Sequence, residues 1–327
     1  MSVDLRDVEL AKGMKIAVET CMQVQPGEKV LVVTDTAQSR RMAEILLAQI
    51  HAVGAEAGLI IYPTLSQHSA EPPAFVAAAM READAVFGIA SKSLTHTNAT
   101  KEARAAGTRI HTWPGVTEEI FLRCCVIDYA ALSARLQKLY QFFREPRQAV
   151  VTSPDGTNLT LETYPRLHPP IDGICANPGE FDQIPSGLVG SGVVEGSASG
   201  TIVINGSIGE LGIVAEPVTW IVEDGRIVEV QGGKDARRFQ QWLADLNDPN
   251  MAVIAELGIG ANPAATLTGN PAEDERIMGG IHFGIGDNAR LFGGKNVASS
   301  HNDVIILGAS LTMDGTPIIK DGQLLID

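Results

Sequence analysis

Four ionisable side chains in the C-terminal third of the chain stand in short apolar or glycine-rich runs. Glu256 lies in AELGIGANP and His282 lies in GGIHFGIGDN. His301 and Asp303 both lie in SSHNDVIILG. Burying an ionised side chain is costly unless a partner neutralises it. A divalent metal is a suitable partner for two imidazoles and two carboxylates, so we predict that these residues form a metal site.

The spacing of His301 and Asp303 strengthens this prediction. Residues two positions apart point to the same side of an extended strand. The apolar run at residues 304–307 follows directly, which favours a strand there. A surface His–Asp pair or a core histidine would show the same spacing, and the residues match no short zinc signature. On spacing alone, metal binding and a structural role both remain open.

Two further candidates lie outside this cluster. His96 stands among hydroxyl side chains in SKSLTHTNAT, as expected of an acid or base that reaches the substrate. The same residues could instead form the N-terminal cap of a helix that includes residues 101–106. Glu180 follows Pro178-Gly179 in ANPGEFDQIPSG, where apolar neighbours could hold it in a turn. From the sequence alone, a solvated turn acid is the favoured interpretation of Glu180.

The N-terminal half alternates helical and strand patterns. The run KVLVVTD at residues 29–35 is typical of a strand buried on both faces. No glycine-rich phosphate motif follows this strand or the later ones, so we expect no nucleotide. The order of elements predicts a parallel sheet with helices on both faces. Helices are predicted at residues 8–24, 39–53, 73–82, 98–106 and 129–143, and further strands at 58–62, 85–90 and 108–113.

The pattern changes after residue 145, and we predict a domain boundary there. The sequence REPR at residues 144–147 contains Pro146, which breaks the helical pattern, and short β-branched runs separated by glycine turns follow it. Pro154-Asp155-Gly156, Asp224-Gly225 and Asp314-Gly315 each join two such runs, as in β-hairpins. The predicted fold is therefore α/β, with an N-terminal parallel-sheet α/β domain at residues 1–145. A mainly antiparallel α+β domain at residues 146–327, with a clear helix at 235–246, carries the metal ligands.

Composition limits the function classes. The 327-residue chain holds 39 acidic and 25 basic residues and has no basic tract, which argues against nucleic acid or an anionic membrane as partner. No apolar run approaches the length of a membrane span, so we expect a cytoplasmic protein. The four cysteines show no CxxC pair, which suggests a reducing compartment and buried thiols.

Most of the chain resembles the aminopeptidase T family of metallopeptidases. The resemblance rests on ANPGEF, VVEGSASGTIVINGSI, AELGIGANP, GIHFGIGDN and HNDVIILG, and on GMKIAVETCMQVQPGEKVLVVTD and SLTHTNATKEARAAGTRI in the N-terminal half. It implies two divalent metals. The implied ligands are Glu180, Glu256, His282, His301 and Asp303. The family's tyrosine ligand has no counterpart, because its position is Ala289 here.

A second resemblance is to 2,5-dihydroxypyridine dioxygenase, an iron(II) enzyme of the same superfamily. FDQIPSG, LNDPNMAVIAELGIGANP and GGKNVASSHND are similar to its motifs. That enzyme holds iron with two histidines and one aspartate. His301 and Asp303 match two of these ligands, whereas Glu256 stands where the other histidine is expected.

The carboxylate-rich ligand set favours hydrolysis, because a metal held by such residues can activate water and polarise a carbonyl. We therefore predict a metal-dependent hydrolase that cleaves a C–N bond in a small molecule or short peptide, with His96 and Glu180 as catalytic residues. One or two Zn, Co, Mn or Mg ions would serve. The alternatives are a non-haem Fe(II) ring-cleaving dioxygenase and an inactive binding protein of the same fold. A homo-oligomer, most simply a two-fold dimer, is expected.

Overall fold

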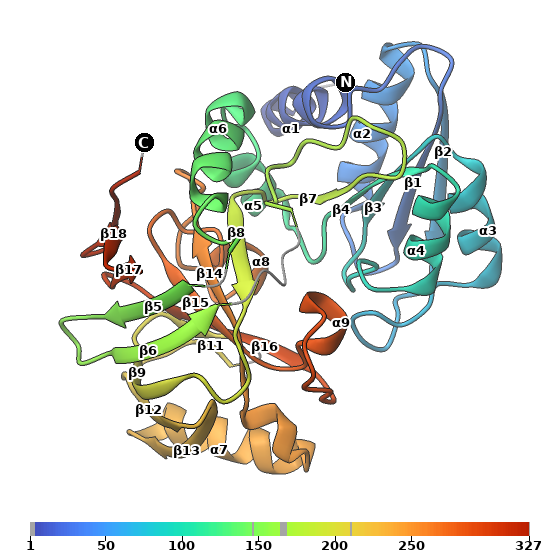
Figure 1. The fold of residues 1–327 in the computed structure, drawn as a ribbon. Coiled ribbons are helices and arrows are strands. Elements are labelled where there is room, and N and C mark those ends of the chain that lie inside the picture. Colours follow the sequence, from blue (N-terminus) through green and yellow to red (C-terminus); the bar gives the residue numbers. More distant parts are fainter. Residues whose placement is uncertain (1–3, 146, 164–168, 210, 327) are drawn as a thin grey trace. The chain divides into compact units, whose positions relative to one another are not determined.

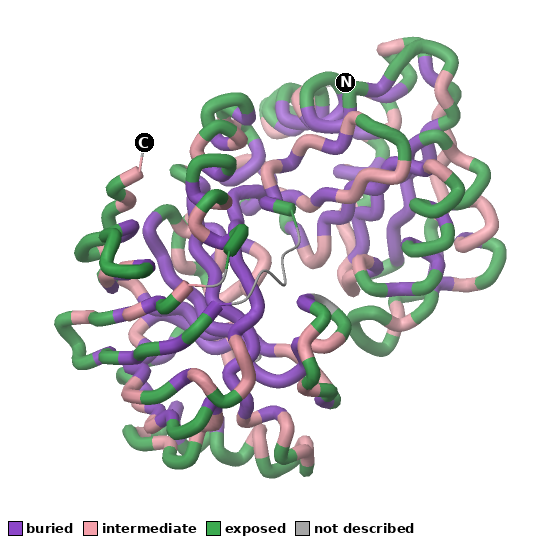
Figure 2. The backbone as a smooth tube through the Cα atoms, in the orientation of Figure 1, coloured by how far each residue is buried: buried purple, intermediate pink, exposed green. Residues whose placement is uncertain are grey.

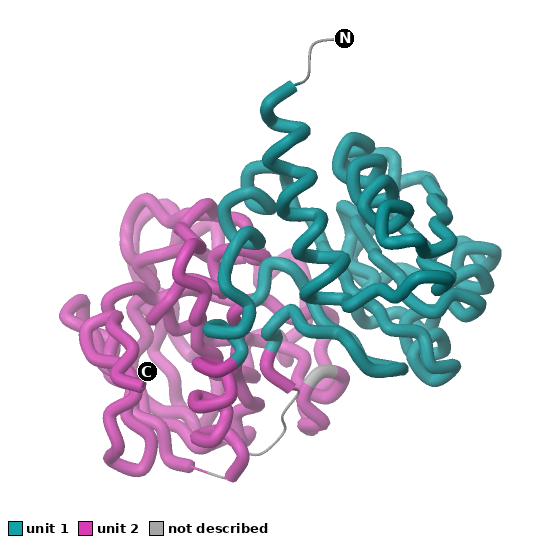
Figure 3. The backbone as a smooth tube through the Cα atoms, turned by 90° about the horizontal axis from the view of Figure 1, so that it is seen from above, with its two compact units in different colours: residues 1–133, 171–186 teal, residues 134–170, 187–327 magenta. Residues whose placement is uncertain are grey.

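The computed structural model describes residues 4–145, 147–163, 169–209 and 211–326, and these residues form two compact units (Figure 3). Unit 1 comprises Met1–Ser133 and Ile171–Ser186, and unit 2 comprises Ala134–Pro170 and Gly187–Asp327. The predicted domains, 1–145 and 146–327, differ from these units because the chain crosses from one unit to the other three times. Helix α6 (Tyr129–Tyr140) contains the first crossing.

Unit 1 is built on a five-stranded parallel sheet with the order β2-β1-β3-β4-β7 (Figure 1). Its strands are β1 (Lys29–Asp35), β2 (Glu56–Tyr62), β3 (Ala85–Ile89), β4 (Arg109–Thr112) and β7 (Phe181–Gln183). The first four were predicted. The fifth strand, β7, lies beyond residue 145 but pairs with β4. Residues 171–186 therefore belong to unit 1.

Helices accompany this sheet as the alternating pattern predicted. They are α1 (Leu5–Ile16), α2 (Arg40–Ala52), α3 (Ala74–Glu82), α4 (Asn98–Ala105) and α5 (Glu118–Cys124), with a π-helical turn at Ala17–Cys21. Side-chain caps set several starts: Ser39, Thr97 and Thr117 accept hydrogen bonds from the backbone of α2, α4 and α5. Apolar residues of β1, β2 and β3 pack with α3 and α4 in one buried cluster that includes Leu31 and Val76. All four cysteines are buried in this unit.

Unit 2 contains two antiparallel sheets. The six-stranded sheet has the order β11-β10-β16-β15-β14-β8, and the eight-stranded sheet has the order β13-β12-β9-β6-β5-β17-β18-β19. The first consists of β8 (Leu188–Gly192), β10 (Ser207–Ile208), β11 (Gly212–Ile213), β14 (Ile254–Gly260), β15 (Ile281–Gly286) and β16 (His301–Ile306). The second consists of β5 (Arg147–Thr152), β6 (Asn158–Thr163), β9 (Ser199–Ile204), β12 (Val218–Glu223), β13 (Arg226–Gln231), β17 (Ser310–Met313), β18 (Thr316–Lys320) and β19 (Gln323–Leu324).

The predicted hairpins occur in the eight-stranded sheet. Asp224 and Gly225 join β12 to β13 with φ values of 47° and 76°, and Asp314 and Gly315 join β17 to β18 with 48° and 77°. Two successive positive φ values are what a tight two-residue hairpin turn requires, and Asp-Gly tolerates them. Unit 2 also holds α7 (Lys234–Leu246), the short α8 (Pro271–Asp274) and α9 (Ala289–Phe292), and a 3₁₀ turn at Pro249–Ala252. The predicted α/β fold class, a parallel sheet followed by antiparallel sheets, is confirmed.

The central strands of each unit are among its most buried segments (Figure 2). Every residue of β3, β14 and β15 is buried. Among the residues that the structure describes, none of the helices is long and apolar enough to cross a membrane.

The cap of α4 gives a first test. Thr97 is fully buried, and its hydroxyl accepts from Thr100 N at 3.1 Å. We expect Thr97→Ala to lower the free energy of unfolding by about 1 kcal/mol, because the first turn of α4 loses its cap. Urea unfolding would measure this. The neighbouring Asn98→Ala, which alters only an exposed side chain, is the control. An equal loss in both variants would contradict the capping role.

Candidate metal centre

Three adjacent strands of unit 2 carry four of the predicted ligand residues. Glu256 lies in β14, His282 in β15, and His301 and Asp303 lie in β16. Strand pairing aligns Glu256 with Gly284 of β15, and Gly284 in turn with Asp303. Directly paired residues share one face of a sheet, so the register alone brings both carboxylates onto the same face.

The sequence produces this face by strict alternation. Successive side chains of a strand point to opposite faces. In β15, His282 and Gly284 alternate with Phe283 and Ile285, and in β14 Glu256 and Gly258 alternate in the same way with Leu257 and Ile259. The apolar residues are fully buried on the opposite face. The motifs AELGIG and IHFGIG therefore encode one apolar face and one face reserved for the ligand-type residues and glycines.

Two glycines make room for the imidazole rings. A Cβ added to Gly258 would lie 2.0 Å from Cε1 of His282, and one added to Gly284 would lie 2.4 Å from Nε2 of His301. Each ring therefore lies over the backbone of the neighbouring strand, at a position where any larger residue would displace it. Strand glycines commonly mark such a close approach. The sequence analysis quoted these glycines within motifs but assigned them no role.

The four side chains converge on one small volume. Glu256 places Oε1 3.3 Å from Nε2 of His282 and Oε2 3.1 Å from Nε2 of His301. Nε2 of His301 is also 3.3 Å from Oδ1 of Asp303. One ligand atom each from Glu256, His282 and Asp303 can be chosen so that all three lie within 4.8 Å of one another. Glu256 is 5% exposed and His282 is 1% exposed, whereas His301 and Asp303 are half-buried at the edge of the cluster.

The orientation of His301 is fixed by its other ring nitrogen. Nδ1 lies 2.8 Å from the backbone carbonyl of Asp287. A carbonyl oxygen only accepts, so Nδ1 carries the hydrogen and Nε2 faces the two carboxylates. Histidines that bind metals are usually held by such a hydrogen bond to a carbonyl or carboxylate.

Charge in the cluster is balanced by protons when no metal is bound. Burial alone would raise the pKa of Glu256, but the hydrogen bonds and charges of His282 and His301 hold it well below its usual range. Burial alone would lower the pKa of His301, but the nearby Asp303 and Glu256 carboxylates raise it well above its usual value. The Glu256 carboxylate likewise outweighs burial at His282 and raises that pKa. The carboxylates therefore attract positive charge, which two protons or a divalent metal can supply.

The donor atoms fit a divalent metal. The buried Oδ1 of Asp303 accepts no hydrogen bond from the described residues, beyond its ion-pair distance to His301. It thus retains an electron pair for a metal. Two imidazole nitrogens with carboxylate oxygens suit Fe(II), Zn or Mn, and a two-histidine, one-carboxylate face is typical of non-haem iron oxygenases.

A further acid beside the cluster had no signal in the sequence. Burial raises the pKa of Glu275 to about 7, which the charge of Arg276 opposes and that of Asp303 reinforces. Glu275 pairs with Arg276, and the main chain of these residues packs against Gly260 of β14. A carboxyl group with a pKa near neutrality can take up or release a proton during a reaction.

Glu180 and His96 belong to unit 1 rather than to the unit that holds the cluster. The Glu180 carboxylate closes its own turn: Oε2 accepts from Ala176 N and Asn177 N at 2.8 Å, and Oε1 accepts from Asn177 Nδ2 at 2.7 Å. His96 is exposed at the turn before α4, where the neighbouring Thr97 provides the cap. Metal binding by Glu180 and the catalytic roles of both residues stay predictions.

The position of the missing tyrosine, Ala289, is the first residue of α9. Both carboxylate oxygens of the nearby Asp287 accept backbone hydrogen bonds within the loop that follows β15. Oδ1 accepts from Arg290 N at 3.0 Å and Oδ2 accepts from Ala298 N at 3.1 Å.

Comparison with known proteins identifies the family. The family model for 2,5-dihydroxypyridine 5,6-dioxygenase (NicX) matches residues 9–326. The chain belongs to this family. The 2,5-dihydroxypyridine 5,6-dioxygenase of Pseudomonas putida KT2440 is 26% identical over 167 residues, and this match spans 47% of each chain, about half the length of that relative. Membership of the family implies a divalent metal and is consistent with a small-molecule substrate.

Two solved structures share the fold. The structure of 2,5-dihydroxypyridine dioxygenase from Pseudomonas putida KT2440 superposes with a TM-score of 0.83 at 19% identity, covering 99% of this chain and 98% of that one. Wild-type AmpT from Thermus thermophilus superposes with a TM-score of 0.70 at 18% identity, covering 98% and 99%. Both likenesses concern the fold alone.

The predicted hydrolase is therefore wrong, and so are the metallopeptidase and aminopeptidase assignments. The family match overturns them, and the resemblance to aminopeptidase T holds for the fold and not for the activity. The error has a chemical reason. Carboxylate and imidazole ligands suit both hydrolytic metals and iron, so a ligand set read from sequence does not distinguish the two reactions. The homo-oligomer stays a prediction.

The glycines beneath the rings give a second test. We expect Gly258→Ala and Gly284→Ala to weaken Co(II) binding by at least about tenfold, because each added methyl group displaces the ring of His282 or His301. Calorimetric titration of metal-free protein would measure this. Gly58→Ala is the matched control, since a Cβ at this strand glycine meets only an ordinary contact at 3.5 Å. Unchanged affinity in all three variants would refute the role of the glycines.

Metal binding should also depend on pH. The raised pKa values of His282 and His301 mean that both rings hold protons up to a higher pH than a free histidine does. A metal must displace these protons, so affinity should rise with pH through the two pKa values and fall in acid. Calorimetry between about pH 6 and about pH 8, in buffers of different protonation enthalpy, counts the protons released. His51→Ala, which removes an exposed histidine, should keep this dependence. Affinity that is independent of pH would contradict it.

Proposed function

We propose that this protein is a non-haem Fe(II) dioxygenase that opens the ring of a small, dihydroxypyridine-like substrate. Glu256, His282, His301 and Asp303 hold one metal ion. The observation that carries the proposal is the convergence of these four side chains on one face of β14, β15 and β16, in a chain of the 2,5-dihydroxypyridine 5,6-dioxygenase family.

The ligand set supports iron. His282, His301 and Asp303 provide the two-histidine, one-carboxylate face on which non-haem Fe(II) oxygenases rely, and such a face leaves coordination positions open. When bound there, Fe(II) supplies the electron chemistry that joins dioxygen to an aromatic ring. Glu256 adds a second carboxylate, which distinguishes this site from a simple facial triad.

The chain's own residues have three tasks in this proposal. In the metal-free site Glu256 lies between His282 and His301, with its carboxylate oxygens 3.3 Å and 3.1 Å from their Nε2 atoms, and it would share the metal with them once the Nε2 protons leave. The burial of Glu256 and His282 keeps bulk water from the centre, which strengthens every charge interaction inside it. Glu275, with its pKa of about 7, is suited to accept a proton from a ring hydroxyl group or to return one.

The decisive experiment is anaerobic reconstitution with Fe(II), followed by addition of 2,5-dihydroxypyridine and oxygen. We expect oxygen uptake with loss of the substrate's ring absorbance. His301→Ala and Asp303→Ala should lower the rate by at least about 100-fold. Loss of a metal ligand should reduce activity more than loss of a group that only orients a ligand, which typically costs about 10- to 100-fold. Zn(II)-loaded protein is the control, since zinc has no redox chemistry. His51→Ala should retain full activity.

Two outcomes would contradict the proposal. Oxygen uptake that survives in both His301→Ala and Asp303→Ala would place the metal elsewhere. Tight binding of a dihydroxypyridine without oxygen uptake, at full Fe(II) occupancy, would favour a catalytically inactive binding protein of the same fold.

A further inference from the structure

The chain between β15 and β16 forms a loop, residues 287–300, that returns directly to His301. Gly286 ends β15 with a φ of +93°, and a Cβ there would lie 2.4 Å from Ser300 O, so glycine is required for this approach. Asp287 follows Gly286, and its backbone contacts Ser300 and His301 at the far end of the loop. Its N–H donates to Ser300 O at 2.8 Å, and its carbonyl accepts from Nδ1 of His301 at 2.8 Å.

The carboxylate of Asp287 closes the same loop from within. The residue is 3% exposed. Oδ1 accepts from Arg290 N at 3.0 Å near the start of the loop, and Oδ2 accepts from Ala298 N at 3.1 Å near its end. The Arg290 guanidinium adds an ion pair at 3.6 Å. A carboxylate can accept at both oxygens, whereas an amide side chain has only one accepting atom. The position therefore favours aspartate over asparagine.

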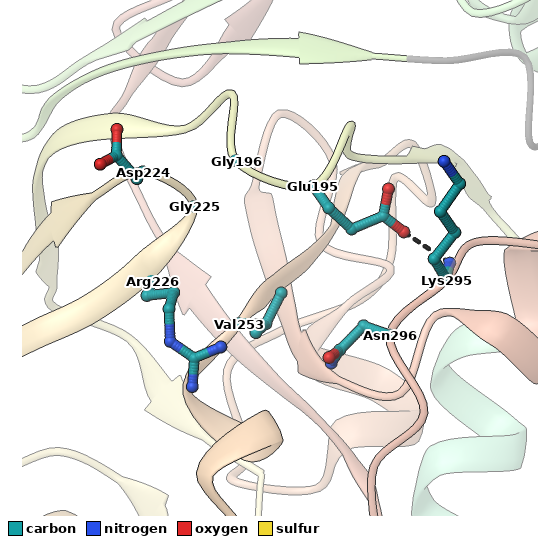
Figure 4. Close-up of a pocket in the computed structure, with 8 residues that line it drawn as sticks. All are labelled: Glu195, Gly196, Asp224, Gly225, Arg226, Val253, Lys295 and Asn296. Atoms are coloured by element: carbon teal, nitrogen blue, oxygen red, sulfur yellow. Dashed lines mark hydrogen bonds between the residues drawn. The ribbon is translucent and has the colours of Figure 1, made fainter.

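A second set of contacts braces the loop independently of Asp287. The side chain of the buried Asn288 accepts from Asn296 N at 2.9 Å and donates to Glu195 Oε1 at 3.0 Å. Asn296 in turn donates to Gly286 O at 2.6 Å. Glu195 and Asn296 line a pocket of about 200 Å³, where Glu195 also accepts from Lys295 N (Figure 4). Because these contacts remain when the Asp287 carboxylate is removed, we expect such a variant to fold.

We propose that Asp287 is a positioning residue for His301. Its carboxylate holds the loop in place, and its carbonyl then keeps the ring hydrogen on Nδ1 and leaves Nε2 to bind the metal. Hydrogen-bond partners of this kind are typically worth 10-fold to about 100-fold in metal affinity. The inference rests on the proposed metal centre, and it concerns a residue that does not touch the metal.

Co(II) titration of the metal-free protein tests the inference, with the visible absorption of bound Co(II) as a readout of ligand geometry. We expect Asp287→Ala to bind Co(II) about tenfold more weakly and to show an altered spectrum. Asp287→Asn, with one accepting oxygen, should fall between this variant and the wild type. The matched control is Asp248→Ala. Asp248 accepts from Ser299 N at 2.6 Å and from Asn250 N at 2.9 Å but contacts neither Asp287 nor the ring of His301, so its loss should change the affinity by less than about twofold.

A measurement on the wild type provides an independent test. Nitrogen and carbon shifts of labelled His301, recorded by NMR on metal-free protein at alkaline pH, should show the ring hydrogen on Nδ1. A hydrogen on Nε2 would overturn the inference, as would unchanged Co(II) affinity and spectrum in Asp287→Ala, or an equal loss in Asp248→Ala. If Asp287→Ala failed to fold, the His301 shifts would decide. If the wild type bound no Co(II), the proposed function would be contradicted. The His301 shifts would still show whether the Asp287 carbonyl keeps the ring hydrogen on Nδ1.

Discussion

Two carboxylates, the buried Glu256 and the half-buried Asp303, lie on one face of three adjacent strands, and their negative charge must be balanced largely inside the protein. Isolated buried charges are too costly to persist. The two imidazoles supply the first part of that balance, and they reach the carboxylates only because Gly258 and Gly284 leave space above the neighbouring strands. The proposed metal site would thus follow from a charge requirement and a steric one, both of which the strand registers meet.

The architecture makes these registers rigid. All four residues lie in strands that are hydrogen-bonded to one another at the centre of the six-stranded sheet. Sites built on paired strands are held more exactly than sites built on loops. The loop that does contribute, residues 287–300, is tied at both ends by hydrogen bonds to Asp287 and acts through a backbone carbonyl. The ligand positions therefore depend on main-chain geometry more than on flexible side chains.

Sequence patterns predicted the parts of this molecule that repeat with a regular period. The His-x-Asp spacing before the apolar run at residues 304–307 predicted that His301 and Asp303 share one face of a strand, and Asp-Gly pairs predicted the hairpins. The three-residue strand β7 has too few residues to show any period, so its return to the first sheet was missed. Glu275 and the Asp287 carbonyl were missed for another reason: burial by distant segments and backbone hydrogen bonds leave no mark in composition. The reaction was mispredicted because the ligand types alone suit two chemistries.

In the proposed site Glu256 is a carboxylate at the position where the resemblance to the dioxygenase implies a histidine. A two-histidine, one-carboxylate face needs a second imidazole besides His301. His282 supplies it from the neighbouring strand, where it pairs with Gly258, two residues beyond Glu256. Glu256 lies 3.3 Å from Nε2 of His282 and 3.1 Å from Nε2 of His301, so it adds a second negative charge beside both rings. The second negative charge favours binding of a divalent cation at the site. Because the two histidines must lose protons when the metal binds, occupancy of the site is linked to pH.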